Sequence, residues 1–260
     1  IVVIHVNHKI YAVLILMIFS ISTNGQKTKK KPIINSVDFP DFSGPIQLTN
    51  VPYEHFFASY YGINSFSANE RYATVLRTAI KDHLPNENEP ATLGLVEIKT
   101  KSFVTIAKTY AWNFQQGCMA HWLSTNPDSL IIYNDLREGK FVSVILNVHT
   151  KKEKKVIPYP ISAVSPNGKE AISINFSRLR ASRDSYGYAG NGQESKINKA
   201  YPKDDGLFLV NLENGVAKLI VSIQDIKKYV PEIKENRIAY FNHTLFSRKG
   251  SKIFWLSRAK

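Results

Sequence analysis

Arginine and tyrosine side chains gather toward the end of the segment 161–190, in a stretch without helical or strand periodicity. They are Arg178, Arg180, Arg183, Tyr186 and Tyr188. A guanidinium group can bind a carboxylate through two parallel hydrogen bonds, and a tyrosine ring can lie against the apolar face of a sugar. The pattern indicates a loop that binds an anionic, sugar-like ligand. The alternative is a solvated basic loop that merely turns at its glycines.

His243 lies in the sequence Tyr-Phe-Asn-His-Thr, at the expected end of a strand. Its imidazole can accept a proton near neutral pH. As a base it would remove a proton from a bound ligand, and an arginine nearby could offset negative charge that builds on a ligand carboxylate. The alternative is a histidine that opens a strand and satisfies a backbone group.

The segment 110–122, YAWNFQQGCMAHW, combines aromatic rings with side-chain amides, a mixture that suits carbohydrate. We expect Trp112 and Gln116 to contact a ligand, and Trp122 to pack in the core. Cys118 is the single cysteine, which excludes an intrachain disulfide and a cysteine-based zinc cluster within this sequence. We expect it to be a small buried side chain.

The formal net charge of +13 over 260 residues favours an anionic partner. Nucleic acid, acidic lipid and acidic polysaccharide are the candidates, and the alternative is a basic surface that serves solubility. The basic residues are not interleaved with aromatic residues along any one expected sheet, which disfavours nucleic acid. We therefore expect an acidic oligosaccharide or an envelope protein as the partner, and no nucleic acid.

Residues 1–26 resemble a secretory signal peptide preceded by an upstream extension. From Lys9 the chain has a basic residue, a short apolar run and then small polar residues. The apolar run is too short for a comfortable membrane span, so we expect no stable span after signal removal. Residues 27–45 are expected to form a basic tail and linker, and residues 46–260 the folded domain. The location expected for the mature protein is the bacterial periplasm or the exterior.

The folded domain consists of two kinds of hairpin that alternate in a fixed order. The first kind, an apolar strand, a polar turn and a second strand, occurs at 64–78, 117–135, 161–176 and 243–258. The second kind follows three of these, at 93–109, 141–159 and 206–222. Two hairpins make a four-stranded antiparallel blade, so the pattern predicts an all-β chain with the architecture of a β-propeller. The only helix expected is a short one within 223–229.

The fourth unit stops after its first hairpin, so about three and a half blades are present. An incomplete ring leaves open sheet edges. We therefore expect the chain to be a fragment of a larger propeller.

The blade pattern resembles the TolB-like and WD40-like propellers of secreted bacterial proteins over nearly all of the mature chain. Three stretches, SPNGKEAISINFSRLR, DDGLFLVNLENGVAKLIVS and YFNHTLFSRKGSKIFW, resemble in their order the N-terminal part of oligogalacturonate lyases. Those enzymes are propellers that cleave short pectin fragments by β-elimination. The resemblance is specific for the fold and weak for function.

The resemblance implies two catalytic residues. The family's arginine falls on Arg178, with Arg180 as the neighbouring alternative, and its histidine falls on His243. The match departs from the family at Asn242 and Thr244, where the family has Gly and Pro. The family also uses a divalent metal, manganese, held by His and Gln residues of later blades. The resemblance thus implies metal ligands outside this chain and none within it.

Two functions remain open from the sequence. The first is an exported polysaccharide lyase of the oligogalacturonate-lyase type, with His243 and Arg178 catalytic. Its expected substrate-binding residues are Arg180, Arg183, Tyr186, Tyr188, Trp112 and Gln116. The second is a propeller without catalysis that binds a protein or glycan at the cell envelope.

Overall fold

A computed structural model describes residues 2–4, 44–50, 52–190, 196–229 and 237–260. Except for residues 2–4 and 44–45, the expected signal peptide and basic tail lie outside the described residues. The chain divides into two compact units, Val2–Leu48 and Thr49–Lys260. In the smaller unit, β1 (Val2–Ile4) pairs antiparallel with β2 (Pro45–Gln47). Neither helix within the described ranges is long and apolar enough to cross a membrane.

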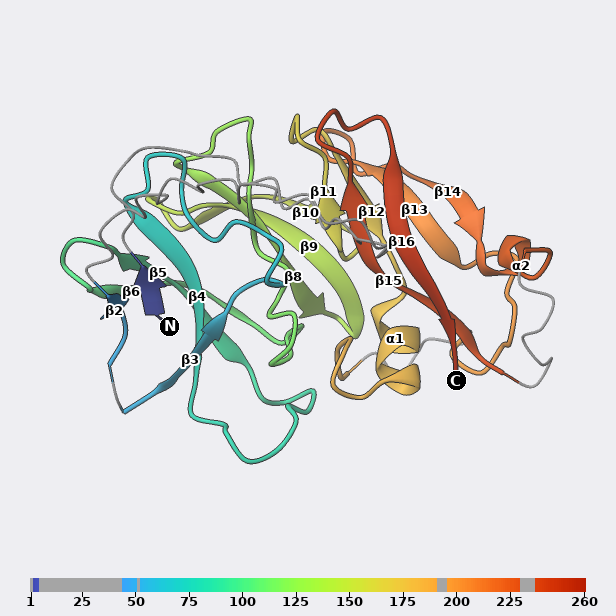
Figure 1. Ribbon diagram of the computed structural model, residues 1–260, viewed down its shortest axis with the longest axis horizontal. Coiled ribbons are helices and arrows are strands. Elements are labelled where there is room, and N and C mark those ends of the chain that lie inside the picture. Colours follow the sequence, from blue (N-terminus) through green and yellow to red (C-terminus); the bar gives the residue numbers. More distant parts are fainter. Residues whose placement is uncertain (1, 5–43, 51, 191–195, 230–236) are drawn as a thin grey trace, which may run out of the picture. The chain divides into compact units, whose positions relative to one another are not determined.

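The larger unit contains three four-stranded antiparallel sheets, in each of which neighbouring strands follow one another in sequence (Figure 1). The first sheet consists of β3 (Glu54–Phe57), β4 (Tyr72–Thr78), β5 (Ala91–Glu97) and β6 (Phe103–Thr109). The second consists of β7 (His121–Trp122), β8 (Leu130–Arg137), β9 (Lys140–Asn147) and β10 (Lys152–Ile157). The third consists of β11 (Ala163–Val164), β12 (Glu170–Ser173), β13 (Gly206–Asn211) and β14 (Ala217–Ser222).

A fourth sheet, of β15 (Ala239–Phe246) and β16 (Ile253–Ala259), completes the described strands of this unit. The expected alternation of two hairpins per blade is confirmed, and with it the all-β propeller architecture. One boundary is wrong. The first strand of the first blade is β3, which pairs with β4, whereas the predicted strand near Phe66 forms only a single bridge to Ala73.

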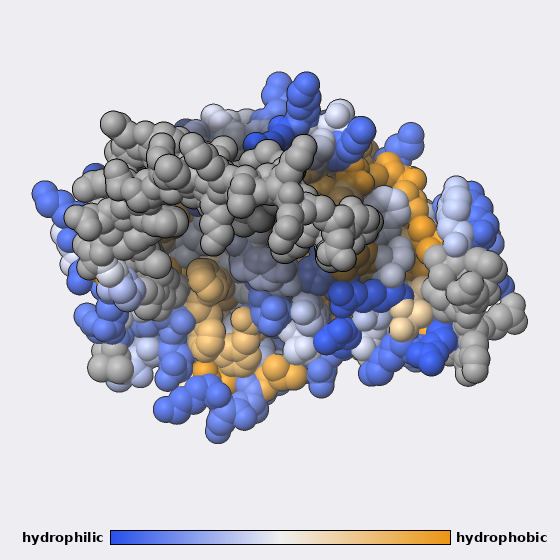
Figure 2. Space-filling model, in the orientation of Figure 1, coloured by the Kyte–Doolittle hydropathy of each residue, from blue (hydrophilic) through white to orange (hydrophobic). Residues whose placement is uncertain are grey.

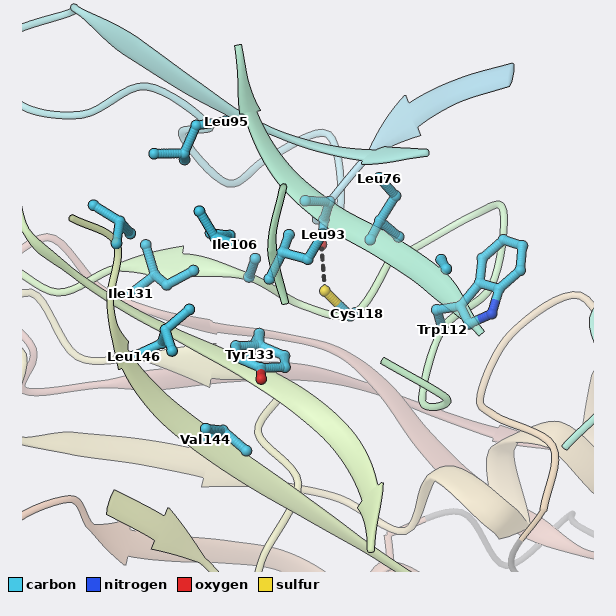
Figure 3. Close-up of a cluster of buried hydrophobic side chains, with 14 of the residues drawn as sticks. Leu76, Leu93, Leu95, Ile106, Trp112, Cys118, Ile131, Tyr133, Val144 and Leu146 are labelled. Atoms are coloured by element: carbon cyan, nitrogen blue, oxygen red, sulfur yellow. Dashed lines mark hydrogen bonds between the residues drawn. The ribbon is translucent and has the colours of Figure 1, made fainter. Parts of the chain in front are cut away.

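Apolar side chains from facing sheets form the core. One cluster joins the first and second sheets, to which Leu76 and Leu93 contribute from the first sheet and Tyr133 and Val144 from the second (Figure 3). A second joins the second and third sheets, and a third extends from there to β15. Cys118 is fully buried in the first cluster, and burial raises the pKa of its thiol, so it is a packed side chain as expected. Sheets packed face to face in succession are the arrangement of propeller blades.

Two short helices interrupt the strands. The predicted helix is confirmed as α2 (Ile223–Ile226), which begins with a capping box between Ser222 and Asp225. The other, α1 (Phe176–Ser182), replaces the first half of the expected aperiodic loop. The Asn175 side chain accepts a hydrogen bond from the Arg178 backbone N–H and so caps this helix. The prediction of a loop here was wrong. The cap and the burial of Phe176 and Leu179 on one face stabilise a helix that is too short to show a helical period in the sequence.

Hydrophilic side chains are spread over the face visible in Figure 2, and hydrophobic ones form separate patches. Several large apolar side chains of the larger unit are more than half exposed. The most exposed are Tyr61, Tyr229, Val216, Phe254 and Phe57. Two of these, Tyr61 and Phe254, line a pocket.

Candidate functional site

A pocket of about 510 Å³ lies beside the first strands of the sheets, and we call it the inner pocket. Its residues come from the loop after β3, the turn before β7, the start of the third sheet, the loop after α1, and β15 with β16. A pocket of this size is in the range that accepts small ligands. It is lined by Tyr60, Tyr61, Gly62, Ile63, Gln116, Met119, Ser162, Ile174, Tyr186, His243, Thr244, Leu245, Phe254, Leu256 and Arg258.

His243 lies on β15 where the strand register shifts between Asn242 and Leu245. Its backbone has φ of 52°, in the left-handed region that disfavours residues with a side chain. The shift turns the imidazole into the inner pocket, where its ring centroid lies 5.0 Å from that of Tyr60 and 5.9 Å from that of Tyr186. Strained backbone of this kind persists where the surrounding structure holds it, and it is found often at functional sites.

The environment favours the neutral form of His243. Burial lowers its pKa below the ordinary value, and the positive charges of Arg258 and Arg183 lower it further. At neutral pH the ring is therefore unprotonated and able to accept a proton. That is the state a general base needs before it acts.

Tyr60 is in ring contact with two other residues of the inner pocket, Tyr61 and His243. Its ring lies 4.2 Å from Tyr61 and 5.0 Å from His243, between centroids. Burial raises the pKa of its phenol, and hydrogen bonding to Tyr61 and Tyr186 raises it further. Tyr60 is consequently a neutral hydroxyl that can donate a hydrogen bond at any physiological pH.

Gln116 supplies a buried acceptor. Its side chain is 4% exposed, and its Oε1 atom has no hydrogen-bond partner among the described residues. A buried amide oxygen without a partner is uncommon because its desolvation is unfavourable. A ligand hydroxyl in the inner pocket would be a suitable donor to it.

The turn that holds Gln116 is organised by Asn113, which sequence reasoning missed. The Asn113 Oδ1 atom accepts hydrogen bonds from the backbone N–H of Gln115 at 2.9 Å and of Gln116 at 2.6 Å. Its Nδ2 atom donates to the Gly187 carbonyl at 2.8 Å, which ties this turn to the loop that carries Tyr186. Asn113 is fully buried, and its hydrogen bonds hold both loops in place. Its only signal in the sequence is an asparagine in a turn.

A second link joins the same turn to the loop after β3. The backbone N–H groups of Cys118 and Ala120 both donate to the Ala58 carbonyl at 3.0 Å. Gly117 has φ of 57°, and a Cβ there would lie 2.4 Å from the Ala58 carbonyl carbon. Only glycine fits at this position. The close approach fixes the loop that continues into Tyr60 and Tyr61.

Arg258 on β16 is the cation of the inner pocket, and sequence reasoning did not single it out. No carboxylate forms a salt bridge with it within the described part of the chain. Arg183, which was predicted, lies with its guanidinium 5.1 Å from the ring centroid of Tyr186 and contributes to the lowered pKa of His243. The signal that could have found Arg258 is the strand alternation of β16.

Arg178 lies away from the inner pocket, in the buried face of α1, and is 1% exposed. Its guanidinium donates to the carbonyls of Lys196 and Ile197 at 2.8 and 3.0 Å and to those of Lys199 and Ala200. Its Nε atom lies 3.8 Å from the Asp205 carboxylate. These contacts anchor the segment 196–205 to the helix, and they use the donors that would bind a substrate carboxylate.

The other predicted residues divide between surface and core. Arg180 donates to the Asp184 carbonyl at 2.5 Å and does not line the inner pocket. Tyr188 is buried, stacked on Phe176 at 4.4 Å, and its hydroxyl accepts from Asn134. Trp112 is buried too, and its indole N–H donates to the Glu89 carbonyl at 2.7 Å. The structure thus gathers three predicted residues, Gln116, Tyr186 and His243, in one pocket.

Metal ligands are not grouped in the described ranges. No set of three or more His, Cys, Asp or Glu side chains there is placed to hold a metal ion. The buried His121 donates from Nδ1 to the Met119 carbonyl at 2.7 Å, and burial lowers its pKa to about 4. It is a neutral residue of the core.

Comparison with known proteins gives the fold. A protein-family model whose description names no activity matches residues 124–233. No curated protein matches the sequence. Among solved structures, oligogalacturonate lyase from Vibrio parahaemolyticus aligns with a TM-score of 0.50 and 11% identity, over 82% of this chain and 49% of that chain.

Two further solved structures are similar. TolB from Acinetobacter baumannii has a TM-score of 0.44 and 10% identity, over 83% of this chain and 41% of that one. An oligogalacturonate lyase in complex with manganese has a TM-score of 0.48 and 10% identity, over 80% of this chain and 54% of that one. The chain therefore spans about half the length of the structures it matches. The expected resemblance to these propellers is confirmed at the level of the fold.

Proposed function

We propose that the inner pocket binds an acidic oligosaccharide and that His243 promotes its cleavage by β-elimination. One observation carries the proposal. Gln116, Tyr186 and His243, which are far apart in the sequence, line one pocket together with the cation of Arg258. Aromatic rings, a buried amide oxygen and an arginine together match the apolar face, hydroxyls and carboxylate of a uronate.

In this reaction the neutral imidazole of His243 takes the proton from the carbon beside the substrate carboxylate. A double bond forms as the bond to the leaving glycosidic oxygen breaks, and that oxygen gains a proton. Arg258 offsets the charge that develops on the carboxylate, because an aligned cation stabilises the transition state more than the ground state. Arg178, the catalytic arginine expected from the sequence, is engaged with backbone carbonyls, so we assign this task to Arg258.

One of the similar solved structures is an oligogalacturonate lyase in complex with manganese. The described residues do not offer a group of ligands that fits a metal ion. No step of the proposed reaction is therefore assigned to a metal.

A specific observation favours the alternative, a propeller that binds without catalysis. The His243 ring is packed between Tyr60 and Tyr186, an arrangement that also suits a purely binding role. In that case the ligand is a glycan or an envelope protein. The two functions differ in whether bound uronate is turned over.

We also propose export to the periplasm or the exterior, on the basis of the apolar run after Lys9. Expression of the full sequence in a bacterium, followed by N-terminal sequencing of the mature protein, tests this. A mature start near Gln26 supports export. An intact N-terminus in the cytoplasm contradicts it.

The main experiment measures binding and turnover separately. Trigalacturonate is titrated into the protein by calorimetry, and elimination is followed by the ultraviolet absorbance of the unsaturated product. Binding with turnover supports the lyase, whereas binding without turnover supports the alternative. If trigalacturonate does not bind, or if a neutral trisaccharide binds equally well, the proposal of an acidic ligand is wrong.

A further inference from the structure

The rim of the inner pocket is apolar, in contrast to its interior. Three of its lining side chains are at least half exposed: Tyr61 at 77%, Phe254 at 56% and Leu245 at 50%. Leu245 and Phe254 are cross-strand partners on β15 and β16, and Tyr61 comes from the loop after β3. The rim thus presents apolar groups from two different sheets beside a polar interior that contains Gln116 and Arg258.

Tyr61 is the most exposed of these groups, yet its ring is held in place. It lies against Tyr60, with 4.2 Å between centroids and an interplanar angle of 39°. A ring that is held before binding loses little rotamer freedom when a ligand covers it. An exposed aromatic face fixed beside a pocket is a suitable platform for an apolar surface.

A pyranose ring fits this combination. It has an apolar face of C–H groups that can lie on an aromatic ring, while its edge carries hydroxyls and, in a uronate, a carboxylate. A sugar in the inner pocket would be continued by the next sugar of the chain at the rim. An extended apolar ligand would not match Gln116 and Arg258 inside the pocket.

We propose that Tyr61 forms an outer subsite, on which the sugar ring adjacent to the one in the inner pocket stacks. This inference rests on the proposed function, because it presumes an acidic oligosaccharide in the pocket. It adds a residue that determines the length of ligand preferred, so the protein should favour oligosaccharides over the single sugar. Tyr61 would contribute to binding without touching the reacting atoms.

The test compares ligands of two lengths. The affinities of the intact chain, Tyr61→Ala and Tyr61→Trp for galacturonate and for trigalacturonate are measured by calorimetry. Tyr229→Ala is the matched control, since Tyr229 is 73% exposed and lines a different pocket. Tyr61→Ala should weaken trigalacturonate binding roughly threefold to tenfold, the range of a stacked aromatic contact. It should change galacturonate binding less than twofold, while Tyr61→Trp and Tyr229→Ala should retain the preference for the longer ligand.

Three outcomes would overturn the inference. If the intact chain binds trigalacturonate and Tyr61→Ala binds it equally well, the subsite is wrong while the proposed function stands. If Tyr61→Ala weakens both ligands equally, Tyr61 belongs to the pocket itself and not to an outer subsite. If the intact chain binds neither ligand, the proposed function and the subsite fail together. Thermal unfolding of each variant verifies that the fold is retained.

Discussion

The inner pocket and the surroundings of Arg178 contain the same kinds of side chain but differ in how these are partnered. Around Arg178 the guanidinium meets four backbone carbonyls and lies near Asp205. In the inner pocket, Gln116 Oε1 has no partner among the described residues, and no carboxylate there pairs with Arg258. Residue type alone does not make a site. In the inner pocket a buried amide oxygen without a partner among the described residues lies with a cation without a salt bridge, and aromatic rings line the same cavity.

The largest expected effect is on catalysis. His243→Ala should lower turnover of trigalacturonate by roughly a hundredfold to ten-thousandfold, the range for removal of a general base. Trigalacturonate affinity should change much less, because the hydroxyl, amide and arginine contacts remain. Turnover and affinity are measured on the same preparations. Undiminished turnover would show that His243 is not the base.

A second variant at the same position separates backbone strain from chemistry. Because His243 has φ of 52°, His243→Gly should be more stable than His243→Ala by about 1 kcal/mol, as measured by denaturant unfolding. Both variants should be equally inactive. Equal stability of the two would show that this backbone conformation is not strained.

Replacement of Arg178 should lower the stability of the fold, because its guanidinium is buried among backbone carbonyls. Arg178→Leu removes the guanidinium donor from several buried carbonyls and the cation beside Asp205, so we expect a loss of about 3 to 5 kcal/mol in the free energy of unfolding. Arg180→Leu, two residues further along α1, is the matched control and should change stability by less than about 1 kcal/mol. The measurement is urea unfolding followed by tryptophan fluorescence. If Arg178→Leu is as stable as the control, the buried contacts described for Arg178 do not stabilise the fold.

Two histidines show the same contrast between the interior of the fold and the inner pocket. His121 lies in the core, whereas His243 lines the inner pocket. Burial lowers the pKa of His121 from 6.5 to about 4, so below pH 6.5 the unfolded chain binds more protons than the folded one. Stability should therefore fall as the pH drops from about 6.5 to about 4, by up to about 3 kcal/mol from this residue.

The variant His121→Asn checks this pH dependence. An asparagine can still donate to the Met119 carbonyl, but it does not titrate. Its unfolding free energy should decrease less than that of the intact chain over the same pH range, with the two chains alike at neutral pH. Parallel pH profiles for the two chains would contradict the assignment to His121.

The fold could be predicted from the sequence because strand alternation and turn residues are local signals. The hairpins at 93–109, 141–159 and 206–222 were predicted nearly to the residue, since each has two strand-like runs around a short polar turn. The helix α1 was missed because its cap and its buried apolar residues, Phe176 and Leu179, span barely two turns. The strand β3 was missed because the predicted start near Phe66 has a similar apolar pattern.

The candidate site could be predicted only in part, for a reason of a different kind. Gln116, Tyr186 and His243 were found because amides, phenols and imidazoles near strand ends are uncommon and chemically distinctive. Which arginine faces the inner pocket depends on how the third and fourth sheets pack. Alternation along β16 places Arg258 on the same face as Phe254 and Leu256, but it does not show that this face meets the pocket. Burial of Trp112 and Tyr188 depends in the same way on contacts distant in sequence.

The last expected effect concerns Arg258, and it tests the comparison with Arg178 most directly. Arg258→Ala should weaken trigalacturonate binding roughly tenfold, because a hydrogen bond to a charged group contributes about 1.5 kcal/mol or more. Stability should change by less than about 0.5 kcal/mol, because Arg258 forms no salt bridge with the described residues. Arg248→Ala, in the exposed turn between β15 and β16, removes the same charge from the same sheet. If both variants weaken binding equally, and added salt abolishes the effect of both, Arg258 acts only through the general positive field. A loss confined to Arg258→Ala, and smaller for a neutral trisaccharide, would instead indicate direct contact with the carboxylate.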